Sequence, residues 1–287
     1  MPPALRTMRQ LLDAYDGVLL DAYGVLVDVS GPLGGARELI ATLNRTRQPY
    51  AICSNDASRL PATYAARFQR AGLEIPPERI INAGMLLERY FAERGLAGAR
   101  TAVLGTADSV AFVAAAGGVS VPLREGMELD VLAVCDDDGF DFRQGLDVVT
   151  SAVARAAAAG RSVHLVLPNP DVLYPKAPGE IGFTAGGMAC MIEAGLARKF
   201  PDRELRFDRL GKPSPELLLL ARQRVLGDAP VERLLMVGDQ VETDIAAARA
   251  AAMDSALVDG VSRWRYVDAA AGPDVATPTY LLETVAP

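Results

Sequence analysis

Short apolar segments alternate with helix-like segments along the whole chain, and this alternation constrains the fold more than any other feature. Seven runs rich in Val, Leu and Ile have the length of buried strands and lie at 17–21, 50–54, 101–105, 130–135, 163–167, 234–238 and 255–259. Helical patterns separate them, at 36–47, 60–71, 85–94, 142–159, 215–225 and 243–252. Parallel strands joined by helices form right-handed crossovers, so the sequence predicts an α/β fold with a doubly wound parallel sheet.

Composition excludes several classes of function. The chain has 287 residues, of which 50% are hydrophobic, enough to bury the core of one or two domains. A net charge of −7 argues against nucleic acid or a membrane surface as partner. No apolar run approaches the roughly 18 residues of a membrane helix, and no signal-peptide pattern is seen at the start. Three cysteines without metal-ligand spacing fit a cytoplasmic protein, and the single histidine argues against His-based triads.

Several polar residues stand at the predicted strand ends or just before a helix. They are Asp21, Ser54 with Asn55, Lys212, Asp239 and Asp244. Taken singly, each is typical of a helix cap, a turn or a solvated surface. Ligands of doubly wound sheets bind beyond the carboxyl ends of the strands, so the joint pattern indicates a site at that edge.

Phosphoryl transfer is the chemistry that this set of residues suits. The carboxylate of Asp21 can act as a nucleophile and form an aspartyl phosphate. Mg²⁺ prefers hard oxygen ligands, which Asp21 and Asp239 can supply. A serine hydroxyl, a backbone N–H and the ammonium group of Lys212 can hold the phosphate oxygens as charge shifts in the transition state.

The order of these residues and the strings around them resemble the haloacid dehalogenase superfamily of aspartate-nucleophile hydrolases. The strings are LLDAYGVLVD around Asp21, ICSNDAS around Ser54, GKPSPE around Lys212 and GDQVETDI at 238–245. Two further strings, NPDVLYP at 169–175 and GFTAGGMACMIEAG at 182–195, are similar to its class IIA branch. That branch holds the N-acetylglucosamine-phosphate, 4-nitrophenyl-phosphate, phosphoglycolate and pyridoxal-phosphate phosphatases.

The resemblance implies a Rossmann-like core with an inserted α/β cap domain. Only 33 positions separate Asp21 from Ser54, whereas 158 separate Ser54 from Lys212, so the cap is expected between the second and third motifs. The expected domains are a first core part at 1–84, the cap at 85–206 and a second core part at 207–287. The branch also makes a homodimer through the cap an open expectation.

The resemblance further implies a Mg²⁺-dependent phosphatase that acts on small phosphorylated metabolites. Asp21 is expected to be the nucleophile, and Ser54, Asn55 and Lys212 are expected to bind the substrate. The expected metal ligands are Asp21, the backbone carbonyl of Tyr23, Asp239 and Asp244.

One residue departs from the family pattern. The phosphatases carry a second Asp two positions after the nucleophile, as general acid and base, and this chain has Tyr23 there. A phenol with a pKa near 10 replaces a carboxyl group poorly, so activity is expected to be weakened, most for poor leaving groups. The 2-haloacid dehalogenases of the superfamily carry Tyr at this position, so dehalogenation stays an alternative, as does a catalytically impaired metabolite-binding protein.

Three further sets of residues have more than one interpretation. Asn169 and Asp171 flank Pro170 and are typical of a turn, or they position the cap. The Gly186-Gly187 pair, placed before a helix, either presents N–H groups to an anion or permits close packing. Trp264 and Tyr266 belong to the core or to a dimer surface.

Overall fold

The computed structural model describes residues 3–177, 180–227, 229–259 and 276–287, so Trp264 and Tyr266 lie outside the described residues. The chain divides into two compact units. The core unit comprises residues 1–54, 61–82 and 212–287, and the inserted unit comprises residues 55–60 and 83–211. The second boundary lies at 211/212 rather than 206/207 because a short strand at 208–209 pairs with the sheet of the inserted unit.

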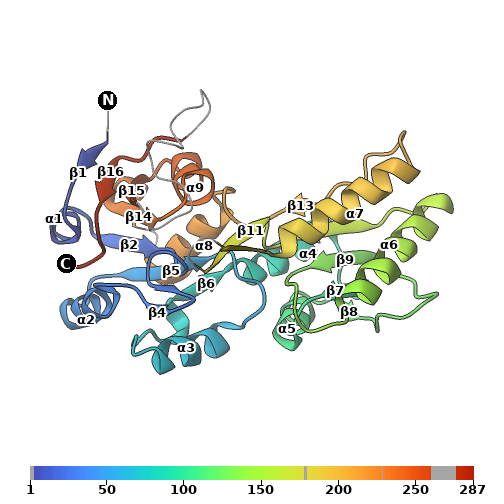
Figure 1. The fold of residues 1–287 in the computed structure, drawn as a ribbon, viewed down its shortest axis with the longest axis horizontal. Coiled ribbons are helices and arrows are strands. Elements are labelled where there is room, and N and C mark those ends of the chain that lie inside the picture. Colours follow the sequence, from blue (N-terminus) through green and yellow to red (C-terminus); the bar gives the residue numbers. More distant parts are fainter. Residues whose placement is uncertain (1–2, 178–179, 228, 260–275) are drawn as a thin grey trace. The chain divides into compact units, whose positions relative to one another are not determined.

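The core unit is built on a seven-stranded sheet in which every pairing is parallel. Its strands, in spatial order, are β1 (Ala4–Leu5), β16 (Tyr280–Leu282), β15 (Asp254–Val258), β14 (Leu234–Gly238), β2 (Gly17–Leu20), β5 (Tyr50–Ser54) and β6 (Ile80–Asn82) (Figure 1). β2 lies between β14 and β5, so the carboxyl ends of these three strands meet at one edge. A small hairpin, β3 (Val27–Asp28) with β4 (Gly31–Pro32), follows β2.

Helices cover both faces of this sheet. Buried side chains of α1 (Met8–Ala14), α2 (Ala36–Thr46) and α3 (Pro61–Arg70) form one cluster with alternate residues of the central strands. α8 (Glu216–Val225) packs against β5 and β6, and α9 (Ala246–Ala250) packs against β15. Buried residues of these two helices lie outside the first cluster. This arrangement confirms the predicted doubly wound parallel sheet.

The inserted unit has its own parallel sheet. Its strands, in spatial order, are β13 (Asp208–Arg209), β10 (His164–Leu167), β9 (Val131–Val134), β7 (Arg100–Leu104) and β8 (Val119–Ser120). One apolar cluster joins this sheet to α6 (Phe142–Ala158) and α7 (Ala185–Lys199), and a second joins it to α4 (Leu86–Arg94) and α5 (Ala107–Ala115). The antiparallel hairpin of β11 (Leu173–Ala177) and β12 (Glu180–Phe183) precedes α7.

All seven predicted strands and all six predicted helical segments are present, with two corrections. The segment predicted as a helix over 243–252 begins as a π-helical turn at Val241–Ile245 and continues as α9. Gly186 and Gly187 lie inside the first turn of α7 rather than before it, because Thr184 is the N-cap residue and its hydroxyl accepts the N–H of Ala185.

Candidate active site

The strand order of the core unit places the predicted acidic residues at one edge of the sheet. Asp21 directly follows β2, and its N–H donates to the carbonyl of Val237 in β14 at 2.9 Å. Asp239 directly follows β14, and Ser54 is the last residue of β5. All three residues are buried. Parallel pairing therefore brings together residues that lie more than 200 positions apart in the sequence.

Lys212 joins the predicted motifs through its ammonium group. Its Nζ donates to Asp21 Oδ1 at 2.7 Å and to Asp244 Oδ1 at 2.6 Å. A third hydrogen bond, of 3.0 Å, reaches the carbonyl of Cys53, which precedes Ser54. The lysine is only 2% exposed, so its charge is balanced almost entirely by these groups. Lys212 is thus a fixed positive charge beside Asp21.

Asp244 also holds the turn that carries Asp239. Its Oδ2 accepts the N–H groups of Asp239 at 3.2 Å and of Gln240 at 3.1 Å. Both oxygens of Asp244 are therefore hydrogen-bonded, one to Lys212 and one to the turn. These contacts fix the backbone from which the side chain of Asp239 projects.

Two glycines make room for the carboxylates. Gly24 has a φ of +90°, and a Cβ at this position would overlap the carboxylate of Asp239. A Cβ at Gly238 would overlap the side chain of Asp244 in the same way. Because only glycine lacks this atom, the close approach of the carboxylates depends on both residues.

The acidic cluster suits a divalent cation. One oxygen each of Asp21, Asp239 and Asp244 lie within 4.8 Å of one another. Asp239 Oδ1 is buried and has no hydrogen-bond partner among the residues that the structure describes. Three carboxylates against one ammonium leave an excess of negative charge, and a buried carboxylate oxygen without a partner is costly. A metal ion with oxygen ligands would satisfy both the charge and the orphaned oxygen.

The pKa shifts of the buried carboxylates also indicate a site suited to a cation. Burial raises the pKa of Asp21 to about 7, because the attraction of Lys212 only partly offsets burial and the repulsion of Asp244. Burial, with repulsion from Asp244 and Asp21, also raises the pKa of Asp239 well above its ordinary value. For Lys212, burial alone would lower the pKa, but Asp21 and Asp244 outweigh it and raise it. The site thus lacks positive charge.

The remaining predicted residues have different surroundings. Tyr23 lies two positions beyond Asp21 in the sequence. It is half-buried and forms an isolated backbone bridge with Val27. Asn55 belongs to the inserted unit, where its side-chain N–H donates to Asp171 Oδ1 at 2.9 Å. The structure therefore gathers Asp21, Lys212, Asp239 and Asp244 into one cluster, with Ser54 beside the carbonyl that Lys212 contacts.

The turn-forming interpretation of Asn169 and Asp171 agrees with their contacts. Asn169 Oδ1 accepts the N–H of Asp171 at 3.1 Å, and its amide donates to Thr184 at 3.1 Å. Gly186 packs closely here, because its N–H donates to the carbonyl of Asp171 and a Cβ would overlap that carbonyl. The structure therefore favours close packing at Gly186.

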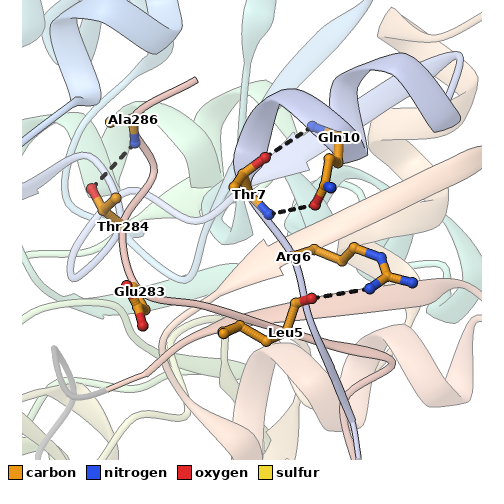
Figure 2. A pocket seen from close by; sticks show the side chains of 7 residues that line it. All are labelled: Leu5, Arg6, Thr7, Gln10, Glu283, Thr284 and Ala286. Atoms are coloured by element: carbon orange, nitrogen blue, oxygen red, sulfur yellow. Dashed lines mark hydrogen bonds between the residues drawn. The ribbon is translucent and has the colours of Figure 1, made fainter.

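A separate pocket lies in the core unit, at the carboxyl ends of β1 and β16. It has a volume of about 240 Å³ and is lined by Leu5, Arg6, Thr7, Gln10, Glu283, Thr284 and Ala286 (Figure 2). Thr7 and Gln10 bond to each other's backbone there as the capping box of α1. None of the predicted site residues lines it.

Sequence reasoning missed several residues that support the site. Gly24, directly after Asp21-Ala22-Tyr23, could have been identified, because a glycine just past a strand end often marks a close backbone approach. Thr106 and Ser109 form the capping box of α5 and also bond the loop at 55–60. Their Thr-x-x-Ser spacing signals a helix start, but nothing local signals the loop contact.

No helix within the described ranges combines the length and the apolar composition needed to cross a membrane.

A doubly wound sheet with a nucleophile candidate, a lysine and paired carboxylates at its carboxyl edge is typical of α/β enzymes that use carboxylate chemistry.

Comparison with known proteins identifies the family. A model described as haloacid dehalogenase-like hydrolase matches residues 18–118, and an HAD-hydrolase-like model matches residues 209–286. The D-glycerol 3-phosphate phosphatase of Mycobacterium tuberculosis is 30% identical over 96% of this chain and 71% of its own length. The chain therefore belongs to the haloacid dehalogenase-like hydrolases. The resemblance drawn from the four motifs is thereby confirmed.

Solved structures agree with this assignment. A possible sugar phosphatase from Cytophaga hutchinsonii has a TM-score of 0.84 and 28% identity, and the match covers 99% of each chain. A glycerol phosphate phosphatase from Mycobacterium tuberculosis, solved with calcium, has a TM-score of 0.77 and 25% identity over 96% of this chain and 73% of its own. A structure of such a phosphatase with magnesium also matches. Both of these complexes contain a divalent metal.

Replacing Gly24 with Ala is expected to weaken binding of a divalent cation by about 10- to 100-fold, because the new Cβ displaces the carboxylate of Asp239. Gly31→Ala is the matched control, since Gly31 also has a positive φ, of +120°, but open space where its Cβ would stand. Calorimetric titration with Mg²⁺ measures both. An equal loss of Mg²⁺ affinity in both variants would show that backbone strain, not the clash with Asp239, is responsible.

Proposed function

We propose that the chain hydrolyses phosphate monoesters of small metabolites through an aspartyl-phosphate intermediate on Asp21. The observation that supports this most is the buried cluster in which Lys212 touches Asp21 and Asp244 while Asp239 Oδ1 has no partner among the described residues. Phosphoryl transfer requires a nucleophile, a fixed positive charge and a carboxylate oxygen that is available to bind a metal ion.

The residues divide the reaction into two steps. An oxygen of Asp21 attacks phosphorus, the ester P–O bond breaks, and the leaving alcohol oxygen takes a proton from solvent water. Water then attacks phosphorus, the P–O bond to Asp21 breaks, and the proton that the water loses passes to solvent. This releases inorganic phosphate and restores the carboxylate of Asp21. The ammonium group of Lys212, at 2.7 Å from Asp21 Oδ1, is positioned to attract the phosphoryl oxygens. The hydroxyl of Ser54 and the backbone N–H of Asn55 would hold these oxygens from the end of β5.

Mg²⁺ is the cation that fits the proposed site, since its ligands are hard oxygens. Asp21, Asp239 and the backbone carbonyl of Tyr23 would hold it, and Asp244 stays a predicted ligand that also orders the turn of Asp239. When bound, the ion would neutralise the carboxylates and withdraw charge from the phosphoryl group.

Tyr23 is proposed to weaken the reaction because its phenol cannot replace the family's acid and base. General acid–base catalysis contributes about 10²- to 10⁴-fold, so poor leaving groups should suffer most. The same tyrosine keeps 2-haloacid dehalogenation as the second candidate, since halide leaves without a proton. The cluster of Asp239 with Asp21 and Asp244 favours the metal-dependent phosphatase.

The names of the relatives support a proposal for the substrate class. The phosphatases compared above have names that refer to a sugar or to glycerol phosphate, and we propose a small phosphorylated metabolite of that kind. The inserted unit is proposed to be the cap domain. The cytoplasmic location and the homodimer stay predictions.

Replacing Asp239 with Asn tests the proposed metal site by stability as well as activity. Without metal, Asp239→Asn should raise the Tm, because a buried carboxylate in a negative cluster is removed. At 100 times the Kd, Mg²⁺ should stabilise the wild type by about 2.7 kcal/mol and the variant hardly at all. Mg²⁺-dependent phosphate release from 4-nitrophenyl phosphate should be lost in parallel.

The exposed residue Glu242, three positions away, supplies the control as Glu242→Gln, which should keep the full Mg²⁺ shift. A variant Asp239→Asn that responds to Mg²⁺ as strongly as the wild type does would contradict the proposed metal site.

A further inference from the structure

The loop at 55–60 follows Ser54 directly, yet it belongs to the inserted unit, whereas the strand before it and the helix after it belong to the core unit. This division matters because Ser54 and the N–H of Asn55 are the groups proposed to hold the phosphate. The side chains that fix the loop therefore bear on where the backbone N–H of Asn55 lies.

The first turn of α5 holds the loop with three side chains. The hydroxyl of Thr106 donates to the carbonyl of Ser58 at 2.6 Å, and the hydroxyl of Ser109 donates to the carbonyl of Ala57 at 2.8 Å. Asp108 Oδ2 accepts the N–H of Leu60 at 2.8 Å. Three residues of the loop, Ala57, Ser58 and Leu60, thus have a backbone group bonded to one helical turn.

Apolar packing and a second polar contact complete the attachment. Ala57 is fully buried in the cluster formed by α4, α5 and the second sheet, and Leu60 packs against the same cluster. At the other end of the loop, Asn55 donates to Asp171 Oδ1, and a Cβ at Gly211 would overlap Asn55. Asp171 is itself fixed by Asn169 and by the N–H of Gly186.

We propose that Thr106, Asp108, Ser109 and Asp171 are positioning residues for phosphate binding, which they control through the loop at 55–60. They hold the loop, so they set the position of the backbone N–H of Asn55, the first residue after Ser54. This inference rests on the proposed function, in that it assumes phosphate is bound at Ser54 and Asn55.

Thr106→Val and Asp171→Ala test the inference at the two ends of the loop. Each removes a hydrogen bond to the loop without touching the cluster around Asp21, and each should weaken binding of inorganic phosphate, with Mg²⁺ present, by about 3- to 10-fold. Amide hydrogen exchange over residues 55–60 should accelerate in both variants. Thr106→Ser keeps the hydroxyl, so it should bind phosphate as tightly as the wild type does. Its amide hydrogen exchange over residues 55–60 should be as slow as in the wild type.

Asp141→Ala is the matched control, because Asp141 caps α6 of the same unit through the N–H of Gln144 and is not bonded to the loop. It should cost a helix cap, as Thr106→Val does, yet keep the phosphate affinity of the wild type. Calorimetric titration of the 287-residue chain and its four variants with inorganic phosphate measures the affinities.

Two results in the variants would each overturn the inference. One is wild-type phosphate affinity in Thr106→Val and Asp171→Ala despite faster exchange in the loop, and the other is an equal loss of affinity in Asp141→Ala. Neither of these two results contradicts the proposed hydrolysis if the wild type still releases phosphate from esters. A wild type that hydrolyses esters without measurable phosphate affinity would also overturn the inference. A wild type that neither binds nor releases phosphate would overturn the proposed function as well.

Discussion

Replacing Asp21 with Asn is expected to lower the rate of phosphate release by about 10⁴-fold or more, because the amide cannot attack phosphorus. The substitution keeps the size of the side chain and its hydrogen-bonding oxygen toward Lys212, so the fold should persist. Loss of a negative charge from a buried cluster should even raise the Tm. Initial rates with 4-nitrophenyl phosphate and a thermal melt of the same sample measure both effects.

The control is the same substitution at the opposite edge of the same sheet. Asp254 begins β15, where its carboxylate accepts hydrogen bonds from Tyr15 and Thr279. Asp254→Asn should leave the rate of release within about twofold of the wild type, although its Tm is expected to fall because these bonds weaken. An Asp21→Asn variant with more than a tenth of wild-type activity would remove Asp21 from the role of nucleophile.

The second large effect is a gain of activity. Tyr23→Asp should raise turnover of alkyl phosphates by about 10²-fold or more, because it supplies the acid that protonates the leaving alcohol and the base that activates water. Release from 4-nitrophenyl phosphate should rise less, since that leaving group needs little help in the first step. The ratio of the two rates, measured at saturating Mg²⁺, reports the leaving-group effect separately from the amount of folded enzyme.

Tyr23→Asn is the matched comparison, because it has nearly the same shape as the Asp variant but no ionisable group. It should lack the gain on alkyl phosphates. A Tyr23→Asp variant with no gain over Tyr23→Asn would show that another group already supplies the proton. In that case the departure from the family pattern would not explain weak activity.

The sequence predicted the parts of the fold that local pattern determines. Long apolar strands such as 50–54 and 234–238 were found at their correct places because burial on both faces makes them continuously hydrophobic. The short strands β1, β6 and β16 were missed, since two or three residues carry too little pattern and become strands only by pairing at the sheet. The helix α5 was missed because its small apolar residues show little amphipathic periodicity.

The candidate site was predictable in its residues but not in its contacts. Motif order and strand ends identified Asp21, Lys212 and Asp239, which the structure gathers in one cluster. That Lys212 would contact Asp244 as well as Asp21 depends on distant backbone geometry that no local string encodes. The attachment of the loop at 55–60 to Thr106 was likewise hidden, because the partners lie 48 positions apart and the signal at Thr106 is that of a helix cap.

Detecting a phosphoryl group on Asp21 during turnover tests the central claim most directly. Tyr23 cannot supply the base for the second step, so the intermediate should accumulate after rapid loss of a good leaving group. Rapid mixing with 4-nitrophenyl phosphate and Mg²⁺ should give a burst of about one 4-nitrophenol per active site. Mass spectrometry of acid-quenched protein should find the phosphoryl group on the peptide that contains residue 21, and Asp21→Asn should show neither signal. Steady release without a burst, with unmodified residue 21 and an active Asp21→Asn variant, would contradict the account.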